Sequence, residues 1–218
     1  MTVLAFDCAI SGLAVAVVRD GAALAEWREE GRGQAATLLP AIAATLEQAQ
    51  VDRRALALIA VTVGPGSFTG VRVGLAAARG LALALGVPLA GITTTAALLA
   101  AAPADDRVAV AAIDTHLGDW YCAFRQQPPF VAATEALVAR LAGQPCRIVG
   151  PQADALARQL PHAVAQQTSP DPVLLARIAT ADGIEAWRTR NRDEGLPRPL
   201  YLRGVNVTSP DGTRRTVE

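Results

Sequence analysis

The chain has 218 residues, equal numbers of acidic and basic side chains and a hydrophobic fraction of 51%, which suits one large or two small domains and excludes a disordered chain. Every basic residue is arginine, so a Walker A loop, a Schiff-base enzyme and a protein kinase are excluded, because each of them needs a lysine. Two histidines and three cysteines without a C-x-x-C pair disfavour a structural zinc site and a disulfide scaffold.

The first thirty residues predict three antiparallel strands. Apolar runs at 3–7 and 13–18 flank a loop of small residues, which is the pattern of a β-hairpin, and Asp7 stands at the end of its first strand. An Asp-Gly turn after this hairpin predicts a third strand at about 22–29.

Helices and strands then alternate up to residue 102. Apolar residues recur at helical spacing over 34–50, which predicts an amphipathic helix. The elements expected after it are a buried strand at 56–63, a helix at 69–85, a short strand at 87–92 and a helix from Thr94 or Thr95 through 102.

The segment 101–106, rich in alanine, proline and aspartate, is the best candidate for a domain boundary, because the pattern restarts after it. A strand, an aspartate, a short loop with a glycine and a second strand occur at Asp7 and again at Asp114. The two aspartates lie half a chain apart, which indicates a duplicated βββαβα unit. We therefore expect an N-terminal lobe at 1–102 and a smaller C-terminal lobe at 103–218.

The second copy of the unit looks reduced. Its expected elements are strands at 108–113, 120–124 and 147–150 and helices at 151–159 and 172–188. The tail after Trp187 is rich in arginine, with Arg188, Arg190, Arg192, Arg198, Arg203, Arg214 and Arg215. Such a tail is either a solvated end or a contact to RNA or to an acidic partner.

Asp7 and Asp114 are candidates for chemistry at the two hairpins. In actin-like ATPases and sugar kinases, an aspartate at a strand end holds magnesium, and the amides of the hairpin loop face phosphates. The alternative is that both are ordinary aspartates that cap turns. His116 follows Asp114 in a polar loop and is more readily explained as an exposed side chain than as a general base. We assign no catalytic residue and no metal ligand.

The string Gly64-Pro-Gly-Ser-Phe-Thr-Gly70 is the most specific one in the chain. Three glycines and a proline form a shaped turn that opens onto a helix N-terminus, where free amides and the helix dipole favour an anion. A packing or interface turn, with Ser67 or Thr69 as the N-cap, is the alternative. The residues expected to lie near a nucleotide are Asp7, Ser11, Gly64, Gly66, Ser67, Thr69 and Asp114.

The helix after this loop carries small residues at Gly70, Gly74 and Ala77, a spacing that lets another helix approach closely. Arg72 and Arg79 share a face of the same helix. Their face either meets solvent or contacts an acidic partner or a nucleotide.

Five strings together resemble the TsaB (YeaZ) family. In chain order they are Val3-Leu4-Ala5-Phe6-Asp7, Leu38-Leu39-Pro40, the run from Gly64 to Gly74, Ala112-Ile113-Asp114 and Pro199-Leu-Tyr-Leu-Arg203. The match is dense over 3–102, present around 109–124 and thin afterwards except at 201–203.

The resemblance implies an α/β, two-lobed actin/Hsp70/sugar-kinase-like fold, which is a duplicated ribonuclease H-like fold, with a reduced C-terminal lobe. It also implies an accessory subunit without an active site of its own, required for threonylcarbamoylation of the adenosine beside the anticodon in tRNAs that read codons beginning with A. In that family the partner TsaD carries the metal and transfers the group, the ATPase TsaE joins them, and TsaC supplies the threonylcarbamoyl-adenylate. The tRNA is then contacted only indirectly.

The family's docking helices correspond here to 34–50 and 69–85. They pair with the same helices of TsaD, or with those of a second copy when TsaD is absent, so the free chain is either a homodimer of this kind or a monomer. The interface residues expected on this basis are Leu38, Leu39, Ile42, Gly70, Val71, Arg72, Gly74, Ala77, Ala78 and Leu81. We expect no cofactor tightly bound by this chain alone, with ATP or ADP and magnesium confined to the interface of the complex.

The chain departs from the family pattern at two places. Cys8-Ala9 stands where Thr-Ser commonly follows the aspartate, which removes a hydroxyl from the predicted phosphate loop, and Gln34 stands where many members have a histidine. The alternative function is an autonomous ATP-dependent phosphotransferase of the actin-like superfamily that uses Asp7, Asp114 and the loop 64–70.

A cytoplasmic location without membrane contact is expected. The N-terminus lacks a basic region, and the sparse cysteines fit a reducing compartment. The uncharged stretch 80–104 is long enough to span a bilayer, but Gly86, Pro88 and Gly91 interrupt it. This stretch therefore predicts a helix end, a buried strand and a second helix.

Overall fold

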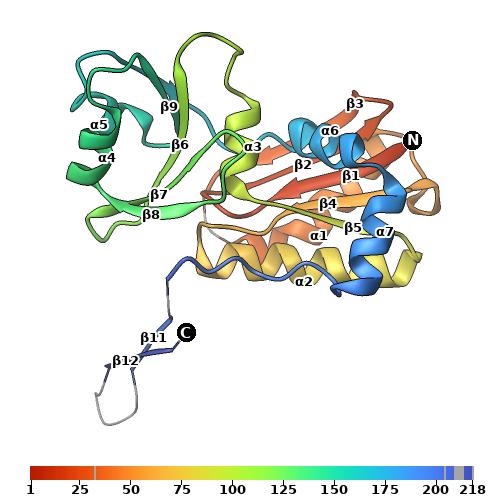
Figure 1. The fold of residues 1–218 in the computed structure, drawn as a ribbon. Helices are drawn as coiled ribbons and strands as arrows, with labels where there is room; N and C mark the ends of the chain where they lie inside the picture. Colours follow the sequence, from red (N-terminus) through yellow and green to blue (C-terminus); the bar gives the residue numbers. More distant parts are fainter. Residues whose placement is uncertain (32, 204, 209–213, 218) are drawn as a thin grey trace.

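Two five-stranded mixed sheets form the body of the protein in the computed structural model, which describes residues 1–31, 33–203, 205–208 and 214–217 (Figure 1). The first sheet contains β1 (Thr2–Asp7), β2 (Leu13–Arg19), β3 (Ala22–Glu29), β4 (Leu58–Thr62) and β5 (Leu89–Ile92). The second contains β6 (Val108–Asp114), β7 (Asp119–Phe124), β8 (Phe130–Ala133), β9 (Cys146–Gly150) and β10 (Ala163–Gln167).

Seven α-helices and a separate strand pair complete the described residues. The helices are α1 (Gln34–Gln48), α2 (Phe68–Leu85), α3 (Thr94–Ala100), α4 (Thr134–Leu141), α5 (Ala153–Ala157), α6 (Pro172–Asp182) and α7 (Ile184–Asp193), with a 3₁₀ turn at Arg53–Ala55. The strand pair is β11 (Val205–Thr208) with β12 (Arg214–Val217), which projects from the body in Figure 1.

The two sheets have the same topology. Their strand orders are β3-β2-β1-β4-β5 and β10-β9-β6-β7-β8. In each sheet the first three strands in chain order pair in antiparallel fashion. The fourth strand pairs in parallel with the first, and the fifth pairs in parallel with the fourth. Read from β3 to β5 and from β8 to β10, the orders are identical, so the predicted duplication and the two-lobed actin-like α/β fold are confirmed.

The second copy is more complete than the sequence predicted. β8, α4 and β10 were not predicted, because β8 and β10 are only four and five residues long and are mostly half-exposed, so they lack a clear apolar run. The predicted helix at 172–188 is divided at Gly183, whose φ of 85° lies outside the helical region. Thr93, rather than Thr94 or Thr95, caps α3 by accepting a hydrogen bond from the amide of Ala96.

Two helices cross between the lobes. α3 follows the first sheet in sequence, yet Leu98 and Leu99 pack with Ala111, Ile113 and other side chains of the second sheet. α6 follows the second sheet, yet it packs on the first. The core that it enters contains Val3, Ala5, Ala16, Val18, Leu58, Ala60, Leu175, Ala176, Ala179 and Trp187.

This crossing corrects the predicted division of the chain at residue 102. Residues 172–193 belong to the core of the first lobe, and α3 contributes to the core of the second. In Figure 1 α3 lies between the lobes, and α6 covers the face of the first sheet opposite to α2. The physical reason is that each sheet has two apolar faces, and the helices of its own half cover only one of them.

α1 and α2 cover the other face of the first sheet. Alternate residues of β1 divide between the two faces, as the strand period requires: Leu4 and Phe6 meet α1 and α2, whereas Val3 and Ala5 meet α6. α2 has the length and apolarity of a membrane-crossing helix, a property that core helices share, and its buried stripe packs on β4.

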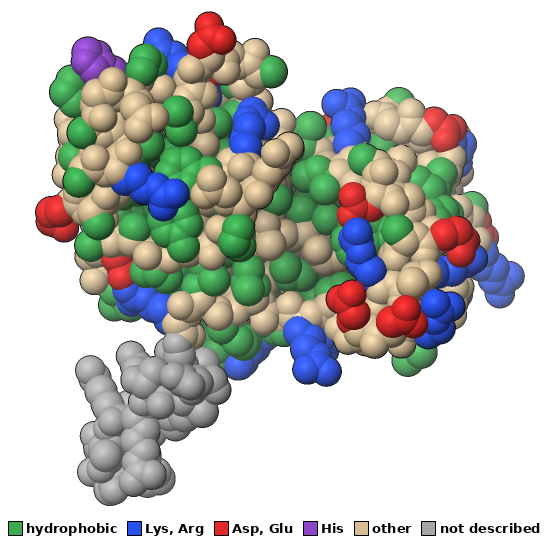
Figure 2. Space-filling view, in the orientation of Figure 1, with side chains coloured by type: hydrophobic (Ala, Val, Ile, Leu, Met, Phe, Trp, Pro, Cys, Tyr) green, Lys and Arg blue, Asp and Glu red, His purple; other side chains and the backbone are tan. Residues whose placement is uncertain are grey.

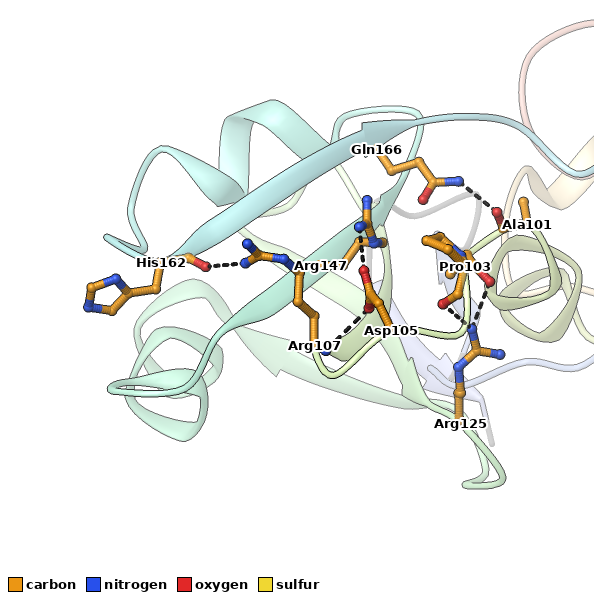
Figure 3. A network of polar contacts seen from close by, with 9 residues as sticks. Ala101, Pro103, Asp105, Arg107, Arg125, Arg147, His162 and Gln166 are labelled. Carbon is orange, nitrogen blue, oxygen red and sulfur yellow. Dashed lines mark hydrogen bonds and ion pairs between the residues drawn. The ribbon is translucent and has the colours of Figure 1, made fainter.

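The predicted boundary segment is held tightly to the second lobe (Figure 3). Arg125 donates to the carbonyl oxygens of Ala102 (2.8 Å) and Pro103 (3.2 Å), and Gln166 donates to that of Ala101 (2.8 Å). Arg147 pairs with Asp105 at 2.6 Å and lowers the pKa of that carboxyl by hydrogen bonding. The crossing from lobe to lobe is therefore a fixed connection.

Charged side chains also gather on the surface near α7. Figure 2 shows basic and acidic groups mixed over the region of α7, where Arg188 pairs with Glu185 and Arg190 with Asp182. Such exposed pairs contribute little to stability, about 0–1 kcal/mol each. Apolar packing of α3 on the second sheet and of α6 on the first sheet is therefore the larger contribution to holding the lobes together.

We predict that Leu175→Ala lowers the free energy of unfolding by about 2–4 kcal/mol, because Leu175 is fully buried in the first lobe's core although it comes from the second half of the sequence. Urea unfolding followed by fluorescence measures this loss. Leu83→Ala is the matched control, since Leu83 is 82% exposed, and it should change stability by less than about 0.5 kcal/mol. Equal small effects of the two variants would contradict the crossing of α6.

Candidate functional site: an interlobe cleft and an apolar groove

The glycine loop between β4 and α2 packs directly against the backbone of the loop after β1. A Cβ atom on Gly66 would lie 2.1 Å from the carbonyl oxygen of Ala9, and one on Gly70 would lie 1.9 Å from that of Cys8. The amide of Ser67 donates to Ala9 O at 2.7 Å, and Ser67 Oγ accepts from the amide of Gly70 as the N-cap of α2. Glycine at 66 and 70 therefore allows two backbones to touch, which supports the packing alternative for this loop.

A polar cleft of about 380 Å³ lies between the lobes beside this contact. Four of the residues predicted near a nucleotide line it: Ser11, Gly66, Ser67 and Asp114. Thr69 lines an adjoining hollow together with Ser11, Ser67, Gln34 and His116. The structure thus brings together five of the seven predicted residues.

Asp7 and Gly64 do not line the cleft. A Cβ atom on Gly64 would meet Leu200 O at 3.1 Å, so this glycine faces the C-terminal segment. Asp7 is buried, and its Oδ1 accepts hydrogen bonds from Thr62 Oγ1 at 2.5 Å and from the amide of Ala9 at 3.0 Å. The predicted role of Asp7 beside a phosphate is therefore not supported, because the carboxylate closes the β1–β2 loop from inside.

Burial raises the pKa of Asp7 to about 6, and the hydrogen bonds from Thr62 and Ala9 offset only part of that shift. Burial and the neighbouring Asp7 carboxylate also raise the pKa of Cys8 to about 12. Cys8 lies in the core, where its side chain faces Gly74, so the departure from the family pattern at this position changes core packing rather than the cleft.

Asp114 has local partners. Its Oδ1 accepts from the amide of His116 at 2.7 Å, and its Oδ2 lies 3.7 Å from His116 Nδ1. Within the described part of the chain, no three His, Cys, Asp or Glu side chains are grouped as metal ligands. With Asp7 engaged by Thr62, the donor set does not fit a magnesium ion held by this chain by itself.

The C-terminal segment 196–203 straps the glycine loop to both lobes. Leu200 N donates to Val63 O at 2.8 Å, and Arg79 donates through Nε and Nη2 to Pro197 O at 3.0 and 2.5 Å. Arg203 forms an ion pair with Asp119 of β7. We call residues 196–203 the C-terminal strap.

An apolar groove of about 500 Å³ runs between α1 and α2 on the outer side of the first lobe. Its lining carries no charged side chain and consists of Ala35, Leu38, Leu39, Val73, Ala76, Ala77, Gly80 and Leu81. Leu39 is 56% exposed, and no described residue covers it. An open apolar groove on a pair of helices is typical of a docking surface.

The predicted interface residues divide between this groove and the core. Leu38, Leu39, Ala77 and Leu81 line the groove, and Arg72 is exposed one helical turn before Ala76. The other five are buried and face the sheet or the β1 loop: Ile42, Gly70, Val71, Gly74 and Ala78.

The position of Gly70 and Gly74 is therefore a correction. Their spacing does permit close approach, but toward the backbone and side chain of Cys8, and not toward another helix. The groove residues that the prediction missed are Ala35, Val73, Ala76 and Gly80. Helical periodicity could have found the three on α2, because they lie opposite the buried stripe of Val71, Gly74, Leu75, Ala78 and Ala82.

Comparison with known proteins matches the fold and the motifs. A family profile described as "TsaD: tRNA N6-adenosine threonylcarbamoyltransferase" matches residues 29–170, more than half of the chain. The tRNA threonylcarbamoyladenosine biosynthesis protein TsaB of Escherichia coli K12 is 33% identical over 129 residues, which cover 58% of this chain and 56% of that protein. A solved Pseudomonas aeruginosa structure, titled YeaZ, has a TM-score of 0.74 at 28% identity and covers 92% of this chain and 99% of that one. The chain belongs to the TsaB (YeaZ) family.

Other members of the TsaB family agree with this assignment. TsaB of Bacillus subtilis 168 is 32% identical over 101 residues, which cover 46% of this chain and 44% of that protein. A second Pseudomonas aeruginosa structure, described as similar to peptidase YEAZ, has a TM-score of 0.75 at 29% identity and covers 93% and 99% of the two chains. The chain spans about half the length of these two curated TsaB relatives, whereas it matches the solved YeaZ structures over nearly their whole length.

Two glycines of α2, Gly70 and Gly80, test whether the close backbone contact at the start of this helix requires glycine. Gly80→Ala should raise the free energy of unfolding by about 0.5–1 kcal/mol, because a Cβ there meets open space and alanine favours the helix. Gly70→Ala should lower it by about 1–3 kcal/mol, because its Cβ overlaps Cys8 O. Chemical unfolding of both variants measures these changes. A Gly70→Ala chain as stable as the wild type would contradict the close backbone contact.

The buried carboxyl of Asp7 should make stability depend on pH. The folded pKa of about 6 exceeds the ordinary value of 3.8, so between these values the folded chain binds more protons than the unfolded chain. The contribution of Asp7 to stability therefore falls as the pH rises from about 4 to about 6. Asp7→Asn keeps an acceptor for Thr62 and Ala9 without the charge, so its advantage over the wild type should grow by about 2–3 kcal/mol across that range. Urea unfolding at pH 4 to 7 measures it; a difference independent of pH would contradict the raised pKa.

Proposed function

We propose that this chain is an accessory subunit required for threonylcarbamoylation of the adenosine beside the anticodon in tRNAs that read codons beginning with A. It acts by holding a TsaD-like catalytic subunit in a competent state. The observation that carries the proposal is the uncovered α1/α2 groove, together with membership of the TsaB family.

The polar cleft favours a supporting role over catalysis by this chain. Asp7 is engaged inside the lobe, and Asp114 is engaged by His116. Among the described residues that line the cleft, the one carboxylate, Asp114, accepts a hydrogen bond from the amide of His116, and the other polar groups are mainly hydroxyls and amides. This lining does not favour an autonomous phosphotransferase. In the proposed assembly ATP or ADP and magnesium lie at the junction with the catalytic subunit, and this chain alone binds neither tightly.

The proposed partners are a TsaD-like catalytic subunit and a TsaE-like ATPase in the cytoplasm, with tRNA contacted indirectly and no membrane involved. A stable specific interface buries about 800 Å² per partner, so the groove would be the centre of a larger contact. In the absence of the catalytic subunit, a second copy occupies the same groove and gives a homodimer.

Reconstitution tests the function. The cognate TsaD-, TsaE- and TsaC-like proteins are mixed with tRNA, threonine, bicarbonate and ATP, and threonylcarbamoyladenosine is measured with and without this chain. Modification should require the chain, and the chain alone should hydrolyse no ATP. Equal modification without it, or ATP hydrolysis by it that Asp7→Ala abolishes, would favour the phosphotransferase instead.

A substitution in the groove tests the interface. Gly80→Arg places a long cation in the groove, where its Cβ meets no neighbour within 4 Å, so the fold should persist. Binding to the TsaD-like subunit and modification should both be lost, by about a hundredfold or more in affinity. Ala181→Arg, exposed on α6 at the opposite face of the sheet, is the matched control and should bind normally. If Gly80→Arg co-elutes with the partner as the wild type does, the groove is not the docking site.

A further inference from the structure

Arg72 is held in one orientation at the surface, beside the groove. Its Nε donates to Tyr201 Oη at 2.7 Å. Its guanidinium carbon lies 3.5 Å from the centroid of the Phe68 ring and 5.6 Å from that of Tyr201. The two rings lie 5.8 Å apart, so α2 and the C-terminal strap build this platform together.

Arg79, the other arginine of α2, contacts the C-terminal strap instead. Arg79 is part-buried and donates twice to Pro197 O, so it fastens the strap. Arg72 is exposed, and no described carboxylate lies within ion-pair distance of it, although ten other ion pairs are formed among the described residues. The face that the sequence predicted to be shared by Arg72 and Arg79 thus presents one oriented cation.

Arg72 and the groove form one continuous surface. Arg72 precedes Ala76 by four residues, so both lie on the same ridge of α2, and Ala76 and Val73 line the groove. A protein that covers the groove therefore also covers Arg72. Covering an unpaired cation is unfavourable unless the partner supplies an acceptor, and a carboxylate matches the planar guanidinium in two hydrogen bonds.

We propose that Arg72, oriented by Phe68 and Tyr201, selects the partner by pairing with a carboxylate next to the partner's apolar docking helix. This inference rests on the proposed function, since it takes the groove as the docking site. The apolar groove supplies contact area without specificity, and the oriented charge supplies the discrimination. Holding the guanidinium before docking also lowers the ordering cost of the contact.

The charge of the two helices favours a different protein over a second copy. α1 and α2 together contain one carboxylate, Glu47, near the end of α1 that lies away from Ala35 and Leu39. A second copy thus offers Arg72 a helix pair with two arginines and a single, distant carboxylate. The partner that fits is a protein whose docking helix has an aspartate or glutamate at the edge of an apolar stripe.

The test measures affinity for the TsaD-like subunit by calorimetry at about 50 and 300 mM salt. Arg72→Glu should weaken binding at least about tenfold at low salt and should flatten the salt dependence, whereas Arg72→Lys should lose less. Arg198→Glu, an equal charge change at an exposed position of the strap, is the matched control and should bind within about twofold. Thermal unfolding checks that each variant is folded.

A charge swap then identifies the contact. An aspartate or glutamate of the partner's docking helix, changed to arginine, should restore binding of Arg72→Glu. If the wild type does not bind the partner at all, the proposed function fails. If the wild type binds and Arg72→Glu binds equally, the function stands and the role of Arg72 is overturned. Loss of tRNA binding without loss of partner binding would overturn it in favour of an RNA contact.

Discussion

The backbone at the start of α2 lies in close contact with the loop that follows β1. Two carbonyl groups, those of Cys8 and Ala9, occupy the space in which any residue larger than glycine at 70 and 66 would place its Cβ. This contact brings α2 flush against the first sheet and fixes its N-terminus beside the interlobe cleft. It also decides which ridge of α2 is buried, and so which ridge is left to form the groove with α1. The positions of the cleft, the groove and the Phe68–Arg72–Tyr201 platform therefore all depend on this contact.

The same contact explains why the cleft is poor in free carboxylates. With the loop packed against α2, Asp7 is buried, and this burial raises its pKa although the hydrogen bonds from Thr62 and the amide of Ala9 offset part of the shift. The C-terminal strap holds the glycine loop a second time, because Leu200 is hydrogen-bonded to Val63 and Arg203 is paired with Asp119 of β7. A site closed in this way is suited to hold a fixed shape for a partner.

The sequence was sufficient for the architecture and insufficient for the surface. The repeat of a strand-end aspartate at Asp7 and Asp114 predicted the duplication, because the topology that the two sheets share begins each of them with the same hairpin. The Gly64–Gly74 string predicted the turn, its N-cap and the helix. The direction in which Gly70 and Gly74 face could not be deduced from spacing alone, since glycines allow close approach to a helix or to a loop equally well. β10 was missed because its partly exposed residues lack a clear period. α4 was missed although Leu137 and Leu141 are buried four residues apart, because a helix of eight residues gives only a short pattern. The helix crossing was missed because the local pattern of a helix carries no information on which sheet the helix covers.

The exchange of α3 and α6 has a consequence for biosynthesis. The first sheet cannot cover its second face until Pro172–Asp182 has left the ribosome, so the N-terminal half cannot complete its folding while the C-terminal half is being made. A nascent chain halted before residue 172 exposes the apolar side chains of Val3, Val18 and Leu58 to the cell. The two halves of the duplicated fold therefore form one folding unit, although each half has a sheet of its own.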